Sequence, residues 1–374
     1  MIGGGAGAFI GAVHRTAATM DGHAVLVAGC LGSAPERALA SGRALGLAAD
    51  RNHPTWRDML KAESALPAER RLDFITVVTP NESHAEIAAA CLRAGFHTVV
   101  DKPMTRTAAE AAELARVAAG GDRLLAVTYN YTGYPLVRQA AQMVRSGEIG
   151  VVRKVVVEYH QGWLATDLAA EGQKQAAWRA DPARAGAGAL GDIGTHAENL
   201  VSFVTGLRLA SVLADVTAFV PGRRVDDDAS VLLRFDGGAK GVLSVCQVAS
   251  GEENNLTLRV YGTEGSLAWR QESPNELILM PREGQRRVLT RAGAGSLETA
   301  RASTRLPPGH PEGFFEAFAN IYRGVIERIA AQLEGRQPAD HALLVPGAAE
   351  GLRGLRFIEA CLASAQASRW TPVA

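Results

Sequence analysis

The sequence predicts an α/β domain with a doubly wound parallel sheet, followed by an α+β domain with a large, mainly antiparallel open sheet. Up to about residue 130, short apolar segments alternate with helix-like segments, as in a parallel sheet with helices on both faces. After about residue 150, strand-like segments follow one another directly, and some are joined by hairpin-turn sequences. We therefore expect domains at 1–130 and 131–374, with C-terminal helices that could pack back on the first domain.

The composition is that of an ordinary globular chain. Of the 374 residues, 47% are hydrophobic and 21% are charged, and 39 acidic side chains balance 39 basic ones. This balance argues against a nucleic-acid or membrane-surface partner. The four cysteines form no CxxC pair, which favours reduced thiols over a disulfide framework or a zinc site. No segment approaches the roughly 20 apolar residues of a membrane span, and the apolar opening lacks the positive region of a signal peptide, so we expect a soluble, cytoplasmic protein.

Glycine and proline mark the ends of the elements expected in the first domain. Pro35 suits the first turn of a helix, and Gly46 and Gly95 suit the position after a helix. The segments expected to form strands are 24–29, 73–78, 98–100 and 124–130. The expected helices are 35–46, 84–94 and 105–119.

The second domain is expected to be rich in strands. These strands are 151–159, 211–219, 229–235, 241–248, 256–261 and 266–270. The glycine-containing connections 236–238 and 262–265 have the composition of hairpin turns. One helix near 188–205 interrupts the strands, and helices near 311–334 and 345–368 follow them.

The glycine-rich stretch MIGGGAGAFIGAVHR opens the chain. A dinucleotide-binding loop needs glycine at a tight turn, glycine where the backbone approaches the pyrophosphate, and a helix N-terminus facing the phosphates. Residues 3–5 meet the first two needs, and 9–18 can form the helix. The third small position is either Ala8 or, in an expanded loop, Gly11. A flexible terminus is the alternative, but the β/α alternation favours the cofactor loop, although an intact first strand needs more residues than the two that precede it.

The sequence leaves the choice between NAD and NADP open. The segment 29–33 has no acidic residue for the ribose hydroxyls and no arginine for a 2′-phosphate. Ser33 suits either cofactor, and Arg37 lies one helical turn further on. NAD is slightly favoured, because no cationic side chain is expected directly at the 2′-phosphate position.

Lys102 follows a predicted strand in the sequence HTVVDKPM. Open α/β sheets bind ligands at the carboxyl ends of their strands. A lysine there, near a positively charged nicotinamide, can donate a hydrogen bond to a substrate oxygen. Pro103 would hold this backbone rigid, either in the trans or in the rarer cis form. A solvated surface lysine is the alternative for an isolated Lys.

The stretch GALGDIGTHAENLVSFV predicts a helix with two distinct faces. The apolar residues that we expect in the core are Leu190, Ile193, Ala197, Leu200 and Val204. Asp192, His196 and Asn199 share another face. A carboxylate and an imidazole one turn apart suit proton transfer. The same spacing suits two metal ligands, but no third ligand is apparent, and no metal is expected. For the pair taken alone, an ordinary surface contact between Asp and His explains the spacing at least as well.

These motifs occur in a fixed order along nearly the whole chain. They are the glycine loop followed by Gly11-Ala12-Val13-His14, the turn Thr79-Pro80-Asn81 with His84, Asp101-Lys102-Pro103, and Gly191-Asp192-Ile193-Gly194-Thr195-His196. In this order the chain resembles the Gfo/Idh/MocA family, the glucose–fructose oxidoreductase and inositol dehydrogenase group. The resemblance implies a Rossmann domain that binds a nicotinamide cofactor, and a second domain whose open sheet builds homodimers or homotetramers.

The resemblance also implies catalytic residues. The family's lysine lies in an EKP motif and matches Lys102, with Asp101 in place of the glutamate, which keeps the charge. The family's aspartate and histidine match Asp192 and His196. By this analogy His196 is the acid/base at the substrate hydroxyl, while Lys102 and Asp192 orient the substrate and tune the proton path.

The expected binding residues extend this set. Cofactor contacts are expected from Gly3, Gly5, Ala8, Phe9, Ile10, Ser33, Thr79, Pro80, Asn81, His84, Asp101, Lys102 and Asn130. Substrate contacts are expected from Lys102, Tyr131, Trp163, Trp178, Arg179, Asp192 and His196. Aromatic faces with scattered polar groups suit a sugar ring, although core packing explains each single aromatic residue equally well.

We therefore expect an NAD(P)-dependent dehydrogenase that oxidises a ring secondary alcohol of a sugar, an anhydrosugar or a cyclitol. The GAGAFIG loop and the TGYP segment look most similar to dehydrogenases of pyranose-type substrates, including levoglucosan and inositol types. The alternatives are a redox-neutral glycosidase-like or epimerase-like member of the same fold, a non-catalytic nucleotide-binding sensor, and a metal-dependent sugar isomerase or lyase.

Overall fold

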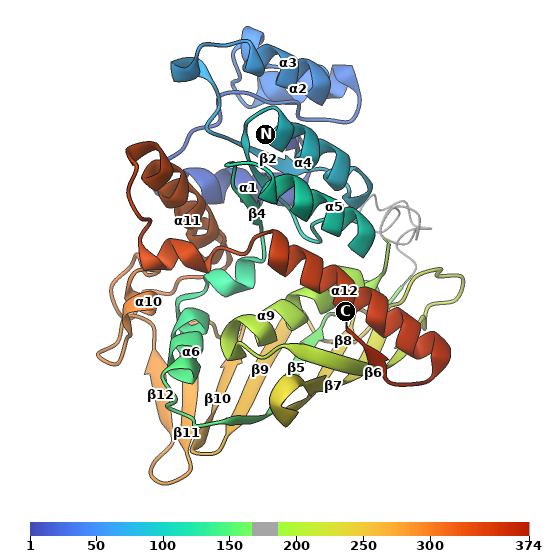
Figure 1. Ribbon diagram of the computed structural model, residues 1–374, viewed down its shortest axis with the longest axis vertical. Helices are drawn as coiled ribbons and strands as arrows, with labels where there is room; N and C mark the ends of the chain where they lie inside the picture. Colours follow the sequence, from blue (N-terminus) through green and yellow to red (C-terminus); the bar gives the residue numbers. More distant parts are fainter. Residues whose placement is uncertain (167–185, 374) are drawn as a thin grey trace. The chain divides into compact units, whose positions relative to one another are not determined.

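The computed structural model describes residues 1–166 and 186–373, and the chain divides into two compact units (Figure 1). Unit 1 comprises Met1–Tyr129 and Phe318–Leu352. Unit 2 comprises Asn130–Ala317 and Arg353–Ala374. Among the described helices, none is long and apolar enough to cross a membrane.

Unit 1 contains a four-stranded parallel sheet in the order β1-β2-β3-β4. Its strands are β1 (Ile2–Gly3), β2 (Phe74–Val78), β3 (His97–Val100) and β4 (Leu125–Val127). The helices of its N-terminal part are α1 (Phe9–Thr19), α2 (Pro35–Ala44), α3 (Trp56–Ser64), α4 (His84–Arg93) and α5 (Ala108–Ala119). β2 and β3 are buried along most of their length. Strands of a parallel sheet that is covered on both faces have continuous apolar sequences, and these two strands have that pattern. This confirms the predicted α/β class.

Local signals explain where these helices begin and end. The side chain of Thr107 accepts the N–H of Glu110 at 3.2 Å, so α5 begins at Ala108, three residues later than expected. Gly46 and Gly95 both have positive φ angles and follow the ends of α2 and α4, as predicted.

The prediction of a strand over 24–29 is wrong. This segment forms only isolated bridges at its end, from Cys30 to Ile2 and from Gly29 to Asn52. A strand needs a partner along its length, and β1 supplies only two residues beside it. Val25 is accordingly 77% exposed.

Unit 2 contains a nine-stranded sheet in the order β12-β11-β10-β9-β5-β8-β7-β6-β13. All its strand pairs are antiparallel except β5 with β8. The strands are β5 (Val152–His160), β6 (Leu209–Thr217), β7 (Asp228–Phe235), β8 (Lys240–Cys246), β9 (Asn255–Gly262), β10 (Gly265–Arg270), β11 (Glu276–Pro281), β12 (Arg287–Thr290) and β13 (Thr371–Pro372). The turns predicted at 236–238 and 262–265 join β7 to β8 and β9 to β10.

Helices cover one face of this sheet (Figure 1). Helix α6 (Pro135–Arg145) packs against β10 and β11, and α9 (Thr195–Thr205) packs against β5, β8 and β9. Side chains along β7 alternate between buried and exposed, so the sheet has a core face and an opposite face. The other helices of the described residues are α10 (Glu298–Arg301) in unit 2, α11 (Phe314–Glu334), most of which belongs to unit 1, and α12 (Ala348–Ala367), most of which belongs to unit 2.

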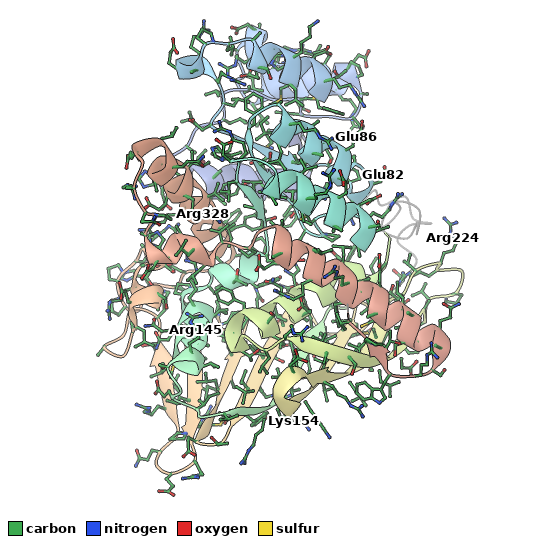
Figure 2. All side chains as sticks on the ribbon, viewed as in Figure 1. Glu82, Glu86, Arg145, Lys154, Arg224 and Arg328 are labelled. Carbon is green, nitrogen blue, oxygen red and sulfur yellow. The ribbon has the colours of Figure 1, made fainter. Side chains whose placement is uncertain are left out.

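Charged side chains mark the outer surface of each unit (Figure 2). Glu82 and Glu86 are exposed around the start of α4 in unit 1. In unit 2, Arg145 ends α6 and Lys154 lies on β5, and both are exposed. These charges are solvated and need no ligand to explain them.

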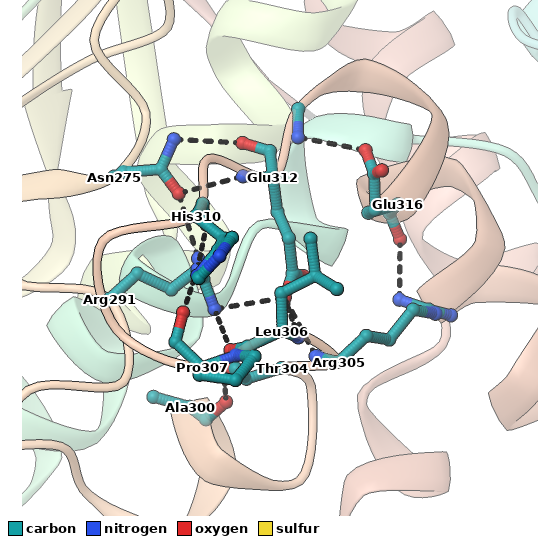
Figure 3. A network of polar contacts seen from close by, with 11 residues as sticks. Asn275, Arg291, Ala300, Thr304, Arg305, Leu306, Pro307, His310, Glu312 and Glu316 are labelled. Carbon is teal, nitrogen blue, oxygen red and sulfur yellow. Dashed lines mark hydrogen bonds and ion pairs between the residues drawn. The ribbon is translucent and has the colours of Figure 1, made fainter.

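A buried ion pair in unit 2 fixes the chain segment that leads into α11 (Figure 3). The Arg291 guanidinium donates to Glu312 Oε1 at 2.9 Å, and both side chains are almost fully buried. The same oxygen accepts the backbone N–H groups of Arg305 and Leu306 at 2.7 Å each. Asn275 joins the network by accepting from Arg291 at 2.9 Å. The segment is thus held by charge-assisted hydrogen bonds rather than by regular secondary structure.

Candidate active site

The glycine loop in unit 1 approaches its surroundings more closely than a side chain would allow. Gly3 and Gly4 have φ angles of +80° and +69°, in the region that favours glycine. A Cβ on Gly5 would lie 1.9 Å from the carbonyl oxygen of Leu31. A Cβ on Gly11 would lie 2.1 Å from the Gly4 carbonyl oxygen, so Gly11 is the residue that lets α1 pack on the loop.

The tip of the loop is exposed beside the start of α1. Gly7 has φ of +80° and nothing within 4 Å of the position of a Cβ. The N–H of Ala6 donates to Ser41 Oγ at 3.2 Å, and Arg15 donates to the Gly4 carbonyl, so the loop is held in place. Ala8 is the N-cap residue of α1 and makes no side-chain cap. A helix start with free N–H groups after such a loop fits a dinucleotide pyrophosphate.

His84 joins the carboxyl end of β2 to the segment after β3. Its side chain is 1% exposed, with Nε2 2.7 Å from the Thr79 carbonyl oxygen and Nδ1 3.0 Å from the Pro103 carbonyl oxygen. Burial lowers the pKa of His84, while the charge of Asp101 and the two carbonyl contacts act in the opposite direction. The Lys102-Pro103 peptide bond is cis, one of the two forms that the sequence allowed.

Asp101 anchors the backbone at Lys102. Its Oδ1 accepts the N–H of Lys102 at 2.9 Å and the hydroxyl of Thr128 at 2.8 Å, and His14 Nε2 lies 3.6 Å away. Burial alone would raise the pKa of Asp101, but the contact with His14 and the charges of Lys102 and His84 bring this pKa well below its ordinary value. Asp101 is therefore a carboxylate at neutral pH.

Behind Asp101, His14 continues a buried polar chain. His14 Nδ1 lies 2.6 Å from the hydroxyl of Tyr322, which in turn donates to Thr76 Oγ1 at 3.2 Å. His14 also contacts the ring of Phe318 edge-on, with ring centroids 4.8 Å apart. Residues of α1, β2 and α11 thus fix the imidazole that faces Asp101.

In unit 2, the helix with Asp192 and His196 begins with a π-helical turn, Leu190–Gly194, that runs into α9. The predicted core face is confirmed, because each of its members is at most 2% exposed: Leu190, Ile193, Ala197, Leu200 and Val204. His196 and Asn199 are also buried, and Asp192 is half-buried. A π-turn is often found at a functional site, and here it carries Asp192.

A hydrogen bond from Gln247 holds the Asp192 carboxylate. Gln247 follows β8 and is 2% exposed, and its side-chain N–H donates to Asp192 Oδ2 at 2.8 Å. A donor at this distance stabilises the ionised carboxylate and fixes its orientation. Gln161, after β5, lies in the same polar group, with its Oε1 accepting from Trp163 at 3.1 Å.

Two tyrosines and an asparagine form a closed ring of hydrogen bonds beside His196. The Tyr131 and Tyr159 hydroxyls are 2.5 Å apart, Tyr159 donates to Asn254 Oδ1 at 2.7 Å, and Asn254 donates back to Tyr131 at 3.3 Å. The Tyr131 ring contacts the His196 ring edge-on, with centroids 4.7 Å apart. Burial raises the pKa of Tyr131 and raises that of Tyr159 much further, so both phenols are neutral.

The structure therefore groups the predicted residues unit by unit. Unit 1 brings together the glycine loop, Thr79, His84, Asp101 and Lys102. Unit 2 brings together Tyr131, Asp192 and His196, with Trp163 attached through Gln161. Among the other predicted residues, Ser33 is exposed, Asn130 opens a short 3-10 turn of unit 2, and Trp178 and Arg179 lie outside the described residues.

Sequence reasoning did not identify four polar residues of unit 2: Tyr159, Gln161, Gln247 and Asn254. Each stands at or next to the end of a strand, where β9, β5 and β8 lie side by side. For the three amides, the signal in the sequence is a polar side chain directly beside an apolar strand. Within the described part of the chain, no group of three or more His, Cys, Asp or Glu side chains could hold a metal ion.

Comparisons with known proteins identify relatives along the whole chain. Residues 1–129 match the family model described as oxidoreductase family, NAD-binding Rossmann fold, and residues 137–268 match the GFO/IDH/MocA C-terminal domain. The crystal structure of an oxidoreductase from Sinorhizobium meliloti is 45% identical, covers 99% of this chain and 98% of its own, and has a TM-score of 0.89.

Two further relatives have names that refer to a sugar or cyclitol dehydrogenase. An inositol dehydrogenase homolog from Azotobacter vinelandii, crystallised with NADH and myo-inositol, is 32% identical, covers 100% of this chain and 96% of its own, and has a TM-score of 0.91. The levoglucosan dehydrogenase of Pseudarthrobacter phenanthrenivorans is 27% identical over 91% of this chain and 87% of that protein. With both family models matched in order, this chain belongs to the Gfo/Idh/MocA family and is an oxidoreductase with an NAD-binding Rossmann domain.

Proposed function

We propose that this oxidoreductase oxidises a ring secondary alcohol of a sugar, an anhydrosugar or a cyclitol. The observation that carries the proposal is the group of polar side chains around Asp192 and His196. It consists of neutral amides and phenols, which can donate to and accept from several hydroxyls at once: Tyr131, Tyr159, Gln161 and Asn254. A relative crystallised with myo-inositol and another named for levoglucosan support this substrate class.

The proposed roles follow from the chemistry of each side chain. His196 removes the hydroxyl proton, since an imidazole nitrogen can accept a proton and act as general base. Asp192 and Lys102 hold the substrate hydroxyl in place, and the Asp192 charge favours the protonated imidazole that forms. The nicotinamide, when bound, supplies the hydride acceptor. Proton removal and orientation are then the tasks of this chain's own residues.

We propose that the units correspond to two domains, with the cofactor on unit 1. Its contacts would be the glycine loop from Gly3 to Ile10, Ser33, the turn Thr79–Asn81 with His84, and Asp101 with Lys102. NAD is preferred, because no cationic side chain lies within the segment 29–33 and Arg37 is exposed on α2. Thermal shifts with NAD and NADP test this, and an NADP affinity more than about tenfold higher would contradict it.

The activity is tested with purified protein and a panel of myo-inositol, scyllo-inositol, levoglucosan, 1,5-anhydroglucitol and glucose. We expect net formation of NADH with at least one of them. Lys102→Ala and His196→Ala should each lower kcat by about 100-fold or more, because each removes a group acting on the reacting hydroxyl. Consumption of substrate without net NADH would indicate the redox-neutral alternative, and full activity of His196→Ala would contradict its role as base.

We also propose that the chain forms homodimers or homotetramers through the sheet face opposite α6 and α9. Strand register places an apolar row on that face, Leu213, Leu232, Val242 and Val156 on β6, β7, β8 and β5. All four are half-buried or exposed, and Leu232 is 46% exposed. Light scattering should show an oligomer that Leu232→Glu dissociates; a monomeric wild-type protein would contradict the proposal.

A further inference from the structure

A single buried carboxylate binds the start of the helix that carries Asp192. Asp226 Oδ1 accepts the N–H of Gly188 and its Oδ2 accepts the N–H of Leu190, each at 2.7 Å. Its backbone carbonyl accepts the N–H of Ala189 at 2.9 Å. Three consecutive N–H groups, of the kind that a helix start leaves without internal partners, are therefore satisfied by one residue that is 8% exposed.

This contact is close enough to fix the first helical turn. A Cβ on Gly188 would lie 1.8 Å from the Asp226 carbonyl oxygen, so the backbones touch directly. The N–H of Asp192 donates to the Gly188 carbonyl at 2.9 Å. Because Gly188 is bound on both sides, the turn cannot slide along the helix axis without breaking several hydrogen bonds. The backbone position of Asp192 is set by Asp226.

The Asp192 side chain is fixed from a second direction by Gln247. The Gln247 amide donates to Asp192 Oδ2 at 2.8 Å, as described above. The backbone N–H of Gln247 donates to the Asp227 carbonyl at 2.8 Å, and its own carbonyl accepts the N–H of Leu164 at 3.1 Å. Residues 226–227 thus connect two contacts. Asp226 binds the backbone at the start of the Asp192 helix, and Asp227 binds the backbone of Gln247, whose side chain holds the Asp192 carboxylate.

We propose that Asp226 and Gln247 form a positioning frame for Asp192: Asp226 fixes the helical turn, and Gln247 fixes the carboxylate that the turn presents. The inference rests on the proposed function, in which Asp192 orients the substrate. Neither residue acts on the substrate. Their effect is geometric, and displacement of a reacting group by about 1 Å can cost about 100-fold in rate.

The chain offers a matched control beside Asp226. Asp227 is fully buried, and its carboxylate accepts the N–H groups of Phe219 and Val220 at 2.8 Å and 3.1 Å and pairs with Arg223 at 3.0 Å. Asp227→Asn therefore loosens the segment 219–223 and leaves the start of the Asp192 helix bound. Asp226→Asn keeps one of the two side-chain oxygens as an acceptor. Its NH2 group replaces the other oxygen and faces a backbone N–H, so one of the two hydrogen bonds to Gly188 and Leu190 is lost.

The frame itself is tested by amide hydrogen exchange in the full-length protein, with no substrate. Asp226→Asn should speed exchange over 187–196, and Asp227→Asn should speed exchange over 217–223 instead. Unchanged protection over 187–196 in Asp226→Asn would overturn the proposal. Because this measurement needs no activity, it decides the frame even if the substrate panel shows no oxidation and the proposed function fails.

Kinetics test whether the frame positions Asp192. With the panel substrate that the wild type oxidises best, Asp226→Asn should lower kcat/KM by about 100-fold, while Asp227→Asn stays close to wild type. Gln247→Leu should lower kcat by about tenfold and change KM little, since the carboxylate loses the donor that orients it. Gln247→Glu, which cannot keep the donor when ionised, should not restore activity. Wild-type kcat and kcat/KM in these variants, with the faster exchange present, would overturn the positioning role.

Discussion

Two carboxylates of low exposure, one in each unit, are held by different kinds of neighbour: the Asp101 side chain is 15% exposed, and Asp226 is 8% exposed. Asp101 in unit 1 lies among ionisable side chains that can carry positive charge: His14, His84 and Lys102. Burial alone would raise the pKa of Asp101, yet these groups bring it well below its ordinary value. The surroundings of Asp101 therefore favour its ionised form.

Asp226 in unit 2 is held mainly by the backbone. Burial raises the pKa of Asp226, although the N–H groups of Leu190 and Gly188 oppose the shift, and the neighbouring Asp227 adds to it. Backbone amides have fixed positions relative to the helix, so Asp226 fixes the position of the helix start. Its ionised form is disfavoured by burial. The comparison shows that a carboxylate can serve two purposes. In unit 1 the surroundings keep Asp101 ionised, and in unit 2 Asp226 keeps the Asp192 helix in position.

The largest expected effect is on the backbone-held carboxylate. Asp226→Ala leaves two buried N–H groups without their acceptor and should lower the free energy of unfolding by about 3 kcal/mol. Urea unfolding measures this. Asp236→Ala, at an exposed turn, is the control and should change stability little. Equal losses in the two variants would show that the buried contact has no special role.

The two carboxylates should also give opposite pH dependence. Asp101, with a folded-state pKa below the unfolded value of about 4, contributes stability above that pH and loses it as the pH falls toward the folded value. Asp226, with a raised folded-state pKa, contributes stability below about pH 4 and loses it as the pH rises through the folded value.

Differences in melting temperature between the wild type and each Asn variant, measured from about pH 3 to about pH 7, test this. The Asp101→Asn difference should grow with pH, and the Asp226→Asn difference should shrink. Curves with the same slope would mean that the surroundings do not set the two shifts, and the contrast between the regions would fail.

The sequence predicted what depends on local periodicity. The apolar spacing of Leu190, Ile193 and Ala197 has a helical period, and the structure buries that face. The strands before Asp101 and Asn81 are continuous apolar segments bounded by turn residues, which is a local signal. Such features need no knowledge of which strand pairs with which.

What the sequence did not reveal depends on strand order. Gln161, Gln247 and Asn254 meet only because β9, β5 and β8 are neighbours, although they are not consecutive in the chain. No local pattern encodes that order. For the same reason the segment 24–29, apolar enough for a strand, forms none where its neighbour β1 is only two residues long.

A smaller effect is expected in the neutral cluster of unit 2. Tyr159→Phe removes the donor to Asn254 and the acceptor for Tyr131, and should cost about 1 to 2 kcal/mol of unfolding free energy. Because both phenols stay neutral, the change in stability should not vary between about pH 4 and about pH 8. Urea unfolding across that range measures it, and a pH-dependent loss would show that the ring of hydrogen bonds carries charge.

The smallest effect is expected for a carboxylate that has a cationic partner but no burial. Glu113 pairs with Arg116 on α5 at 2.7 Å, and this hydrogen bond lowers the pKa of Glu113. Both side chains are more than half exposed, so water and salt screen the interaction. Glu113→Gln should therefore leave the melting temperature unchanged within error at physiological salt, as measured by calorimetry beside Asp101→Asn. If Glu113→Gln lowers the melting temperature as much as Asp101→Asn, a cationic neighbour stabilises the fold even when the carboxylate is exposed. The opposite pKa shifts of Asp101 and Asp226 would then come from their partners and not from burial.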